Sequence, residues 1–77
     1  MKLVEFLIME NLPTNGTHLG IVELRNNVMS DFFSIKKRAE PDIFEIALEE
    51  LNSQQYVFIN KGKETIAATQ FGINRFN

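Results

Sequence analysis

A chain of 77 residues suffices for one small domain and excludes a large active-site cleft, so we expect residues 1–77 to form a single unit. Hydrophobic residues make up 44% of the chain and charged residues 23%, a composition that excludes a disordered protein and is typical of a globular domain. The formal net charge of −2 excludes an overall attraction to nucleic acid or acidic membranes, so any such binding must come from a local basic patch.

The chain contains no cysteine, which excludes disulfide bonds, thiolate metal ligands and a cysteine nucleophile. The apolar run within residues 1–9 is interrupted by Glu5 and is too short for a membrane span or a secretory signal. We therefore predict a cytoplasmic protein with no membrane partner, because a cysteine-free chain suits a reducing compartment.

The N-terminal half predicts two helices separated by a turn. Residues 2–11 are apolar on most sides and predict a first helix, which Leu12-Pro13 terminates. Residues 14–16 have the composition of a tight turn, and residues 17–19 are expected to form a short strand. A second, amphipathic helix begins at Ile21, and its apolar residues recur at steps of three and four: Ile21, Leu24, Val28 and Phe32.

Residues 34–40 predict a solvent-facing connection between the second and third helices. They include Lys36, Lys37 and Arg38 side by side, and a run this polar between two helices is typical of an exposed loop. A compact helix-turn-helix has a shorter connection, so the boundary between these helices is expected to be irregular.

Pro41 is expected to open the third helix, where its fixed φ and missing N–H are tolerated. Asp42 and Glu45 would then lie near the positive end of the helix dipole. One face of this helix is an apolar stripe formed by Ile43, Phe44, Ala47, Leu48 and Leu51. The opposite face is polar and consists of Asp42, Glu45, Glu49 and Asn52.

The last part of the chain predicts a β-hairpin and a short tail. Residues 56–59 are aromatic and β-branched, and residues 65–68 follow after the polar turn 60–64. Thr69 is expected to cap a terminal helix or turn that begins at Gln70. Three apolar side chains of the tail are expected to pack back on the body: Phe71, Ile73 and Phe76.

The order helix, short strand, helix, helix and hairpin resembles the winged-helix family. The strongest local similarity is Ala-Leu-Glu-Glu-Leu at residues 47–51, followed by the strand at 56–59, because the third helix of that family ends in such a stripe and runs into the wing. Residues 68–73 are also similar to the closing segment of winged-helix regulators. The resemblance implies an α+β fold with three helices, a C-terminal antiparallel hairpin (the wing) in a sheet of two or three strands, and a short tail or helical turn.

Catalytic residues and metal ligands have little support in the sequence. His18 is the single histidine, and no Ser, Cys or carboxylate is placed beside it in a motif, so we interpret it as a solvated or packed side chain. The acidic residues at 40–50 match no metal-ligand template, and the scattered glycines form no phosphate loop. We predict a protein that is not an enzyme and has no metal or cofactor.

The resemblance implies binding to double-stranded DNA, with the third helix in the major groove and the wing on the phosphates. We therefore predict first a small transcriptional regulator whose contacts come from the basic loop and the wing. The cations carried over from the resemblance are Arg25, Lys36, Lys37, Arg38, Lys61 and Lys63, and Arg75 of the tail is a further candidate. Clustered cations of this kind give a salt-dependent affinity through counterion release.

The acidic third helix favours a second interpretation. Asp42, Glu45 and Glu49 would face phosphates in the usual docking, which is electrostatically unfavourable. Winged-helix domains also bind proteins, and the same acids would then form a docking face for a basic partner. A homodimer is compatible with both functions, because so small a core does not readily enclose every aromatic residue. The phenylalanines expected in excess are Phe32, Phe33, Phe71 and Phe76.

Overall fold

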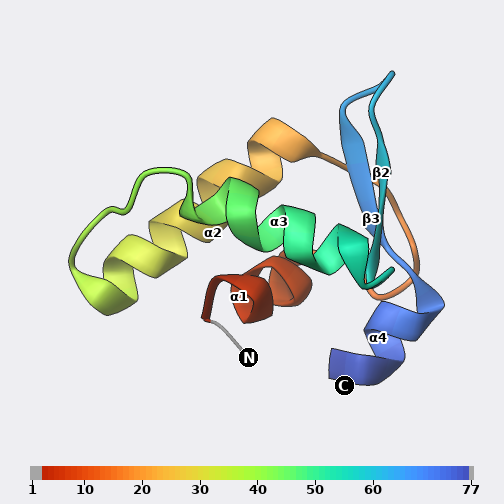
Figure 1. The fold of residues 1–77 in the computed structure, drawn as a ribbon, viewed down its shortest axis with the longest axis horizontal. Coiled ribbons are helices and arrows are strands. Elements are labelled where there is room, and N and C mark those ends of the chain that lie inside the picture. Colours follow the sequence, from red (N-terminus) through yellow and green to blue (C-terminus); the bar gives the residue numbers. More distant parts are fainter. Residues whose placement is uncertain (1–2, 77) are drawn as a thin grey trace.

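The computed structural model describes residues 3–76 and has the predicted α+β composition. Three helices lie together on one side of a small sheet, and a fourth follows the last strand (Figure 1). The helices are α1 (Leu3–Asn11), α2 (Ile21–Lys36), α3 (Ile43–Ser53) and α4 (Gln70–Phe76). The described residues thus contain one helix more than the three expected, because the tail is helical throughout α4. Lys2, where the first helix was predicted to begin, and Asn77 lie outside the described residues.

The sheet is antiparallel and has the strand order β1-β3-β2. Its strands are β1 (Leu19–Gly20), β2 (Val57–Asn60) and β3 (Thr65–Ala68). The predicted hairpin is confirmed, with β2 one residue shorter at its start and one residue longer at its end than expected. The short strand predicted at 17–19 is wrong in position, because Asn15 accepts hydrogen bonds from the Thr17 amide at 3.0 Å and hydroxyl at 2.6 Å, which holds Thr17 in the turn.

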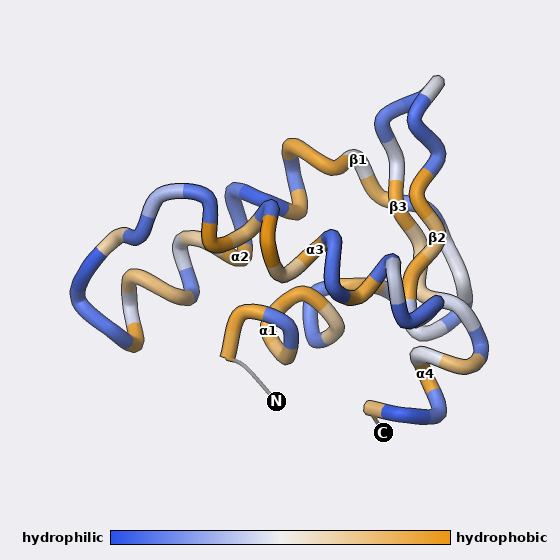
Figure 2. Tube along the Cα trace, viewed as in Figure 1, coloured by the Kyte–Doolittle hydropathy of each residue, from blue (hydrophilic) through white to orange (hydrophobic). Residues whose placement is uncertain are grey.

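One hydrophobic core joins α1, α2, α3 and the sheet. The largest fully buried side chains are Phe44, Ile8, Leu24, Leu51, Ile66 and Val28. They come from α1, from the predicted apolar stripes of α2 and α3, and from the inward face of β3, where side chains alternate between the two faces of the strand. Figure 2 shows hydrophilic segments at two projecting ends, the α2–α3 connection and the outer part of the hairpin.

The connection between α2 and α3 is shorter than predicted. Helix α2 continues through Lys36 and ends at Lys37, which is left-handed with φ 58° and donates its N–H to the Phe33 carbonyl at 2.8 Å. The predicted loop at 34–40 is therefore wrong for residues 34–36. Pro41 does not open α3 as predicted, because Asp42 is itself left-handed with φ 62° and the helix begins at Ile43.

Thr69 caps α4 as predicted. Its hydroxyl accepts the Gly72 amide at 2.9 Å and donates to the Gln55 carbonyl at 2.7 Å, so the start of α4 is tied to the end of α3. The Tyr56 carbonyl also accepts the Thr69 amide at 3.1 Å. These bonds fix the hairpin and α4 to the helical body at one junction.

The aromatic side chains of the tail divide between the interior and the surface. Phe76 is partly buried, with its ring edge against Tyr56 at a centroid separation of 5.4 Å. Phe71 does not enter the core as predicted, because it lies on the outer side of α4 and only stacks on Tyr56 at 5.2 Å. Phe32 is buried, so the predicted excess of aromatic residues is limited to Phe33 and Phe71 among those four.

We expect Gly72→Ala to destabilise the protein by about 3 kcal/mol, because an added Cβ would overlap the Tyr56 carbonyl group and lie 2.8 Å from its carbon. Urea unfolding followed by circular dichroism measures the change. Gly20→Ala is the matched control, since a Cβ at Gly20 meets open space, and its effect should stay within about 0.5 kcal/mol. Equal stability of the Gly72→Ala and Gly20→Ala variants would contradict close packing of Gly72 against the Tyr56 carbonyl group.

Candidate interaction surface on helix α3

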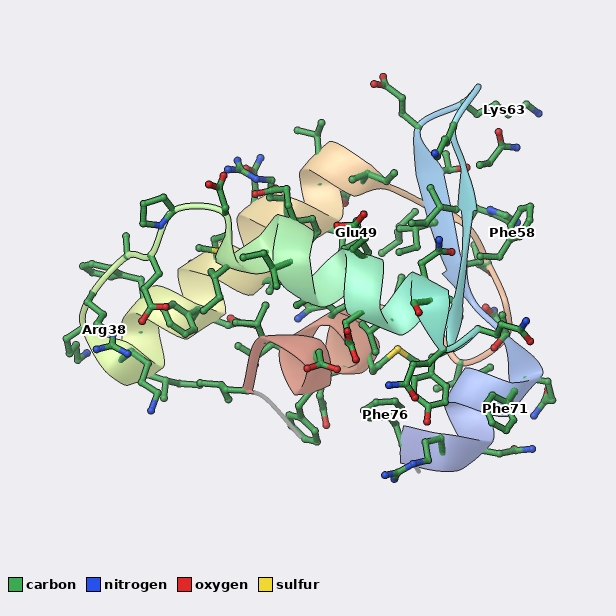
Figure 3. All side chains as sticks on the ribbon, in the orientation of Figure 1. Arg38, Glu49, Phe58, Lys63, Phe71 and Phe76 are labelled. Atoms are coloured by element: carbon green, nitrogen blue, oxygen red, sulfur yellow. The ribbon has the colours of Figure 1, made fainter. Side chains whose placement is uncertain are left out.

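The charged residues predicted from the sequence lie in three separate places. Figure 3 shows Arg38 at one end of the molecule, Lys63 at the other and Glu49 between them. The longest dimension of the protein is 32 Å, so the two basic groups are far apart for a molecule of this size. The structure does not join the basic loop and the hairpin tip into one continuous basic face, and acidic α3 lies between them.

The basic residues of the α2–α3 connection have structural contacts of their own. Lys36 and Lys37 lie at the C-terminal end of α2, where positive charge is favoured by the helix dipole. The Arg38 guanidinium forms an ion pair with the Glu40 carboxylate, with 2.6 Å between Nη2 and Oε1. Part of the predicted basic charge is therefore balanced within the loop.

Arg25 joins α2 to α3 instead of projecting freely. Its Nε lies 2.9 Å from Oε2 of Glu45, and both side chains are about half exposed. Because of this ion pair, neither Arg25 nor Glu45 is an unpaired charge on the surface. The acidic face predicted from Asp42, Glu45 and Glu49 consequently loses its middle member.

An exposed isoleucine lies among the remaining acids of α3. Ile46 is 57% exposed, although it belongs to the helix that supplies much of the core. Neighbours three and four residues apart share one side of a helix, so Glu49 and Glu50 flank Ile46 on the following turn and Asp42 precedes it by one turn. The Ile46 amide donates to the Asp42 carbonyl at 3.0 Å, which fixes this spacing.

These three acids have no cationic partner in the described part of the chain. The ion pairs among residues 3–76 are Arg25–Glu45 and Arg38–Glu40. Glu50 accepts only a neutral hydrogen bond from the Gln54 amide, at 3.2 Å. The surface around Ile46 therefore carries uncompensated negative charge.

A groove of about 350 Å³ runs beside Ile46. It lies where α1 begins, α2 ends and α3 begins, and its lining is mostly apolar. The lining residues are Leu3, Val4, Phe32, Arg38, Glu40, Ile43, Ile46 and Ala47. The groove thus has a mostly apolar lining, with the Arg38–Glu40 ion pair on its loop side.

Ile46 and Glu50 were not among the site residues predicted from the sequence. The signal was present, because Ile46 is the large apolar residue of residues 43–51 that falls outside the predicted stripe. An apolar residue that lies outside the apolar stripe of an amphipathic helix is expected to be exposed to solvent. The groove itself had no sequence signal, since its walls come from three helices.

The hairpin tip presents a different set of groups. Lys61 and Lys63 are exposed in the turn, and the Asn60 side chain accepts the Lys63 amide at 3.2 Å. Phe58 on β2 is 56% exposed and projects from the hairpin on the same side as Lys63 (Figure 3). His18 lies beside it, with the two rings perpendicular and their centroids 6.1 Å apart.

Residues 3–76 contain no group of three histidine, cysteine or acidic side chains placed to hold a metal ion. Among the described helices, none is both long enough and apolar enough to cross a membrane. Comparisons with protein-family models, curated proteins and solved structures found no significant match for this chain.

We expect the Arg25–Glu45 pair to orient α2 and α3 while adding little stability. A double-mutant cycle with Arg25→Ala and Glu45→Ala should give a coupling energy below about 1 kcal/mol, because the exposed pair is screened by solvent. Thermal unfolding at low and high salt measures it, and the coupling should fall as salt rises. A larger coupling that does not respond to salt would contradict this assignment.

Proposed function

We propose that this chain is a winged-helix domain. The order of its elements, the direct passage from α3 into a hairpin and the strand order β1-β3-β2 all support the assignment. In such a fold the β2–β3 hairpin is the wing and α3 is the helix placed for recognition. Because one fold serves many functions, the function must be argued from the surfaces.

We infer that the domain is a non-enzymatic protein-interaction module whose binding surface is α3 with the adjoining groove. The single observation that carries this inference is Ile46, an exposed apolar side chain among three unpaired carboxylates at the edge of an apolar groove. Apolar anchors surrounded by charged groups are typical of protein interfaces, in which a few central side chains supply most of the binding energy. A cysteine-free chain of this kind suits the cytoplasm.

The chemistry of this surface defines the partner. An apolar side chain of the partner would enter the groove and contact Ile46, and lysine or arginine side chains beside it would approach Glu49 and Glu50. A basic amphipathic helix has both features on one face. Charge complementarity of this kind steers association and selects against acidic partners.

The same residues argue against α3 as a reader of the DNA major groove. Insertion of α3 would bring Glu49 and Asp42 toward phosphates, and Arg25 is already paired with Glu45. A helix that exposes mainly acids and amides makes few of the arginine and lysine contacts on which base recognition usually depends.

We expect Ile46→Ser to weaken binding of a labelled basic amphipathic peptide, with leucine and lysine at helical spacing, by about tenfold or more. Fluorescence anisotropy measures the affinity. Val22→Ser is the matched control, because Val22 is 66% exposed on α2 but does not line the groove. Glu49→Gln with Glu50→Gln should reduce the salt dependence of binding. Equal affinities for the Ile46 and Val22 variants, or no binding by the parent chain, would overturn the proposal.

Duplex DNA binding through the wing is the second candidate function. It is favoured by Lys61 and Lys63, which form no ion pair with any residue in the described range 3–76. The Asn60 contact holds the turn that carries them, so two cations are presented at a defined tip. A site of this kind would contact phosphates and would carry little sequence information.

If the wing binds duplex DNA, replacing Lys61 and Lys63 by alanine should lower the slope of log affinity against log salt by about two units. A polarization titration with random duplex DNA at several salt concentrations measures this slope. Lys36→Ala with Lys37→Ala removes the same charge at the opposite end of the molecule, and this pair should leave the slope unchanged. A lower slope in the variant that lacks Lys36 and Lys37 would assign the DNA contact to the α2–α3 connection instead. Absence of binding at low salt would exclude the nucleic-acid candidate.

A further inference from the structure

The hairpin has an outer face, directed away from the three helices that lie together on one side of the sheet (Figure 1). Val57, Ile66 and Ala68 belong to the hydrophobic core, so their side chains point toward the helices. Side chains alternate along a strand, so Phe58 on β2 and its cross-strand partner Ala67 on β3 point the other way. Phe58 and Ala67 therefore belong to a second surface of the hairpin, opposite the core.

Two aromatic rings meet on this outer face, and we call the pair Phe58 and His18 the aromatic platform. The register of Leu19 opposite Ile66 places His18, one residue before β1, beside Ala67, which Phe58 flanks from the other strand. The two outer strands of a three-stranded sheet lie about 10 Å apart, whereas the centroids of these rings are 6.1 Å apart. The rings therefore lean toward each other across β3, and Ala67 beneath them is only 5% exposed.

The aromatic platform is held in orientation but stays open to solvent. Its rings are perpendicular, so the edge of one meets the face of the other, which is an arrangement that aromatic pairs favour. His18 is exposed, and Phe58 is more than half exposed. A planar ligand can therefore contact a ring whose position is already fixed, which lowers the entropy cost of binding.

The hairpin tip beside the platform carries a small excess of positive charge. Its charged residues are Lys61, Lys63 and Glu64, and within residues 3–76 none of them forms an ion pair. Lys63 projects on the same side as Phe58 (Figure 3), and its amide is held by the Asn60 side chain at 3.2 Å. An excess of one positive charge attracts a polyanion only weakly, so most of the affinity for such a ligand has to come from the platform.

We propose that the outer face of the hairpin binds single-stranded nucleic acid, with one unpaired base stacked on Phe58 and the adjoining phosphates near Lys61 and Lys63. Every base has a planar π face, so this contact tolerates any sequence. The bases of a duplex are already stacked on their neighbours, and exposing one costs free energy, so the platform selects single strands. The proposal shares the two lysines with the duplex candidate, goes beyond it through the aromatic platform, and does not depend on the α3 surface.

Substitutions at Phe58 test the stacking contact. Fluorescence anisotropy with a labelled oligothymidylate at low salt should show binding by the parent chain. Phe58→Leu should weaken binding about tenfold, because leucine is apolar but has no π face, whereas Phe58→Tyr should keep the affinity. Phe33→Leu is the matched control, since Phe33 is 55% exposed near the end of α2, away from the hairpin (Figure 1). Circular dichroism of each variant separates loss of binding from loss of folding.

An abasic strand of the same length and charge gives a second readout, which needs no change in the protein. The parent chain should bind the abasic strand about tenfold more weakly than the oligothymidylate, because the phosphates remain but the stacking base is gone. The Phe58→Leu variant should bind both strands equally, because it has no stacking contact left to lose.

Duplex DNA of the same length separates this proposal from the duplex candidate. Tighter binding of the single strand, with the preference lost in Phe58→Leu, would support the platform. Equal or tighter binding of the duplex, unchanged in Phe58→Leu, would reject the platform and leave the wing as a duplex contact. No binding of the oligothymidylate by the parent chain would also overturn the proposal, as would equal affinity for the abasic strand. None of these outcomes alters the peptide test of α3.

Discussion

Burial of one face of α3 is the constraint on which the rest of the structure depends. Phe44 and Leu51 are almost fully enclosed by the other helices and the sheet, so the rotation of the helix about its axis is fixed. With that rotation fixed, Ile46 and the carboxylates beside it must face solvent. The end of the same helix determines where the hairpin starts, because the Leu51 carbonyl accepts the Tyr56 amide at 3.0 Å. The core thereby positions both the proposed protein-binding surface and the wing.

Ion pairs within the chain then determine which charged side chains remain for contact with a partner. Arg25 neutralises Glu45, and Arg38 neutralises Glu40, so the unpaired groups on α3 are mostly acidic. These exposed pairs contribute little to folding free energy, but they change the charge that an approaching molecule meets. Within residues 3–76, acidic α3 therefore lies between Arg38 at one end and Lys63 at the other, and the basic connection and the hairpin tip do not form one continuous basic face.

The sequence by itself determined the elements whose signals are local. The periodic stripes of α2 and α3, the hairpin and the Thr69 cap depend on spacing, β-propensity and a side chain that reaches its own neighbouring backbone. The tertiary structure decided everything that depends on residues far apart in the chain. The pairing of Arg25 with Glu45, the exposure of Phe71 and the groove beside Ile46 all follow from packing between separate elements. A sequence pattern indicates which face of a helix is apolar. Only the folded chain shows which charged side chains form ion pairs and which apolar side chains stay exposed to solvent.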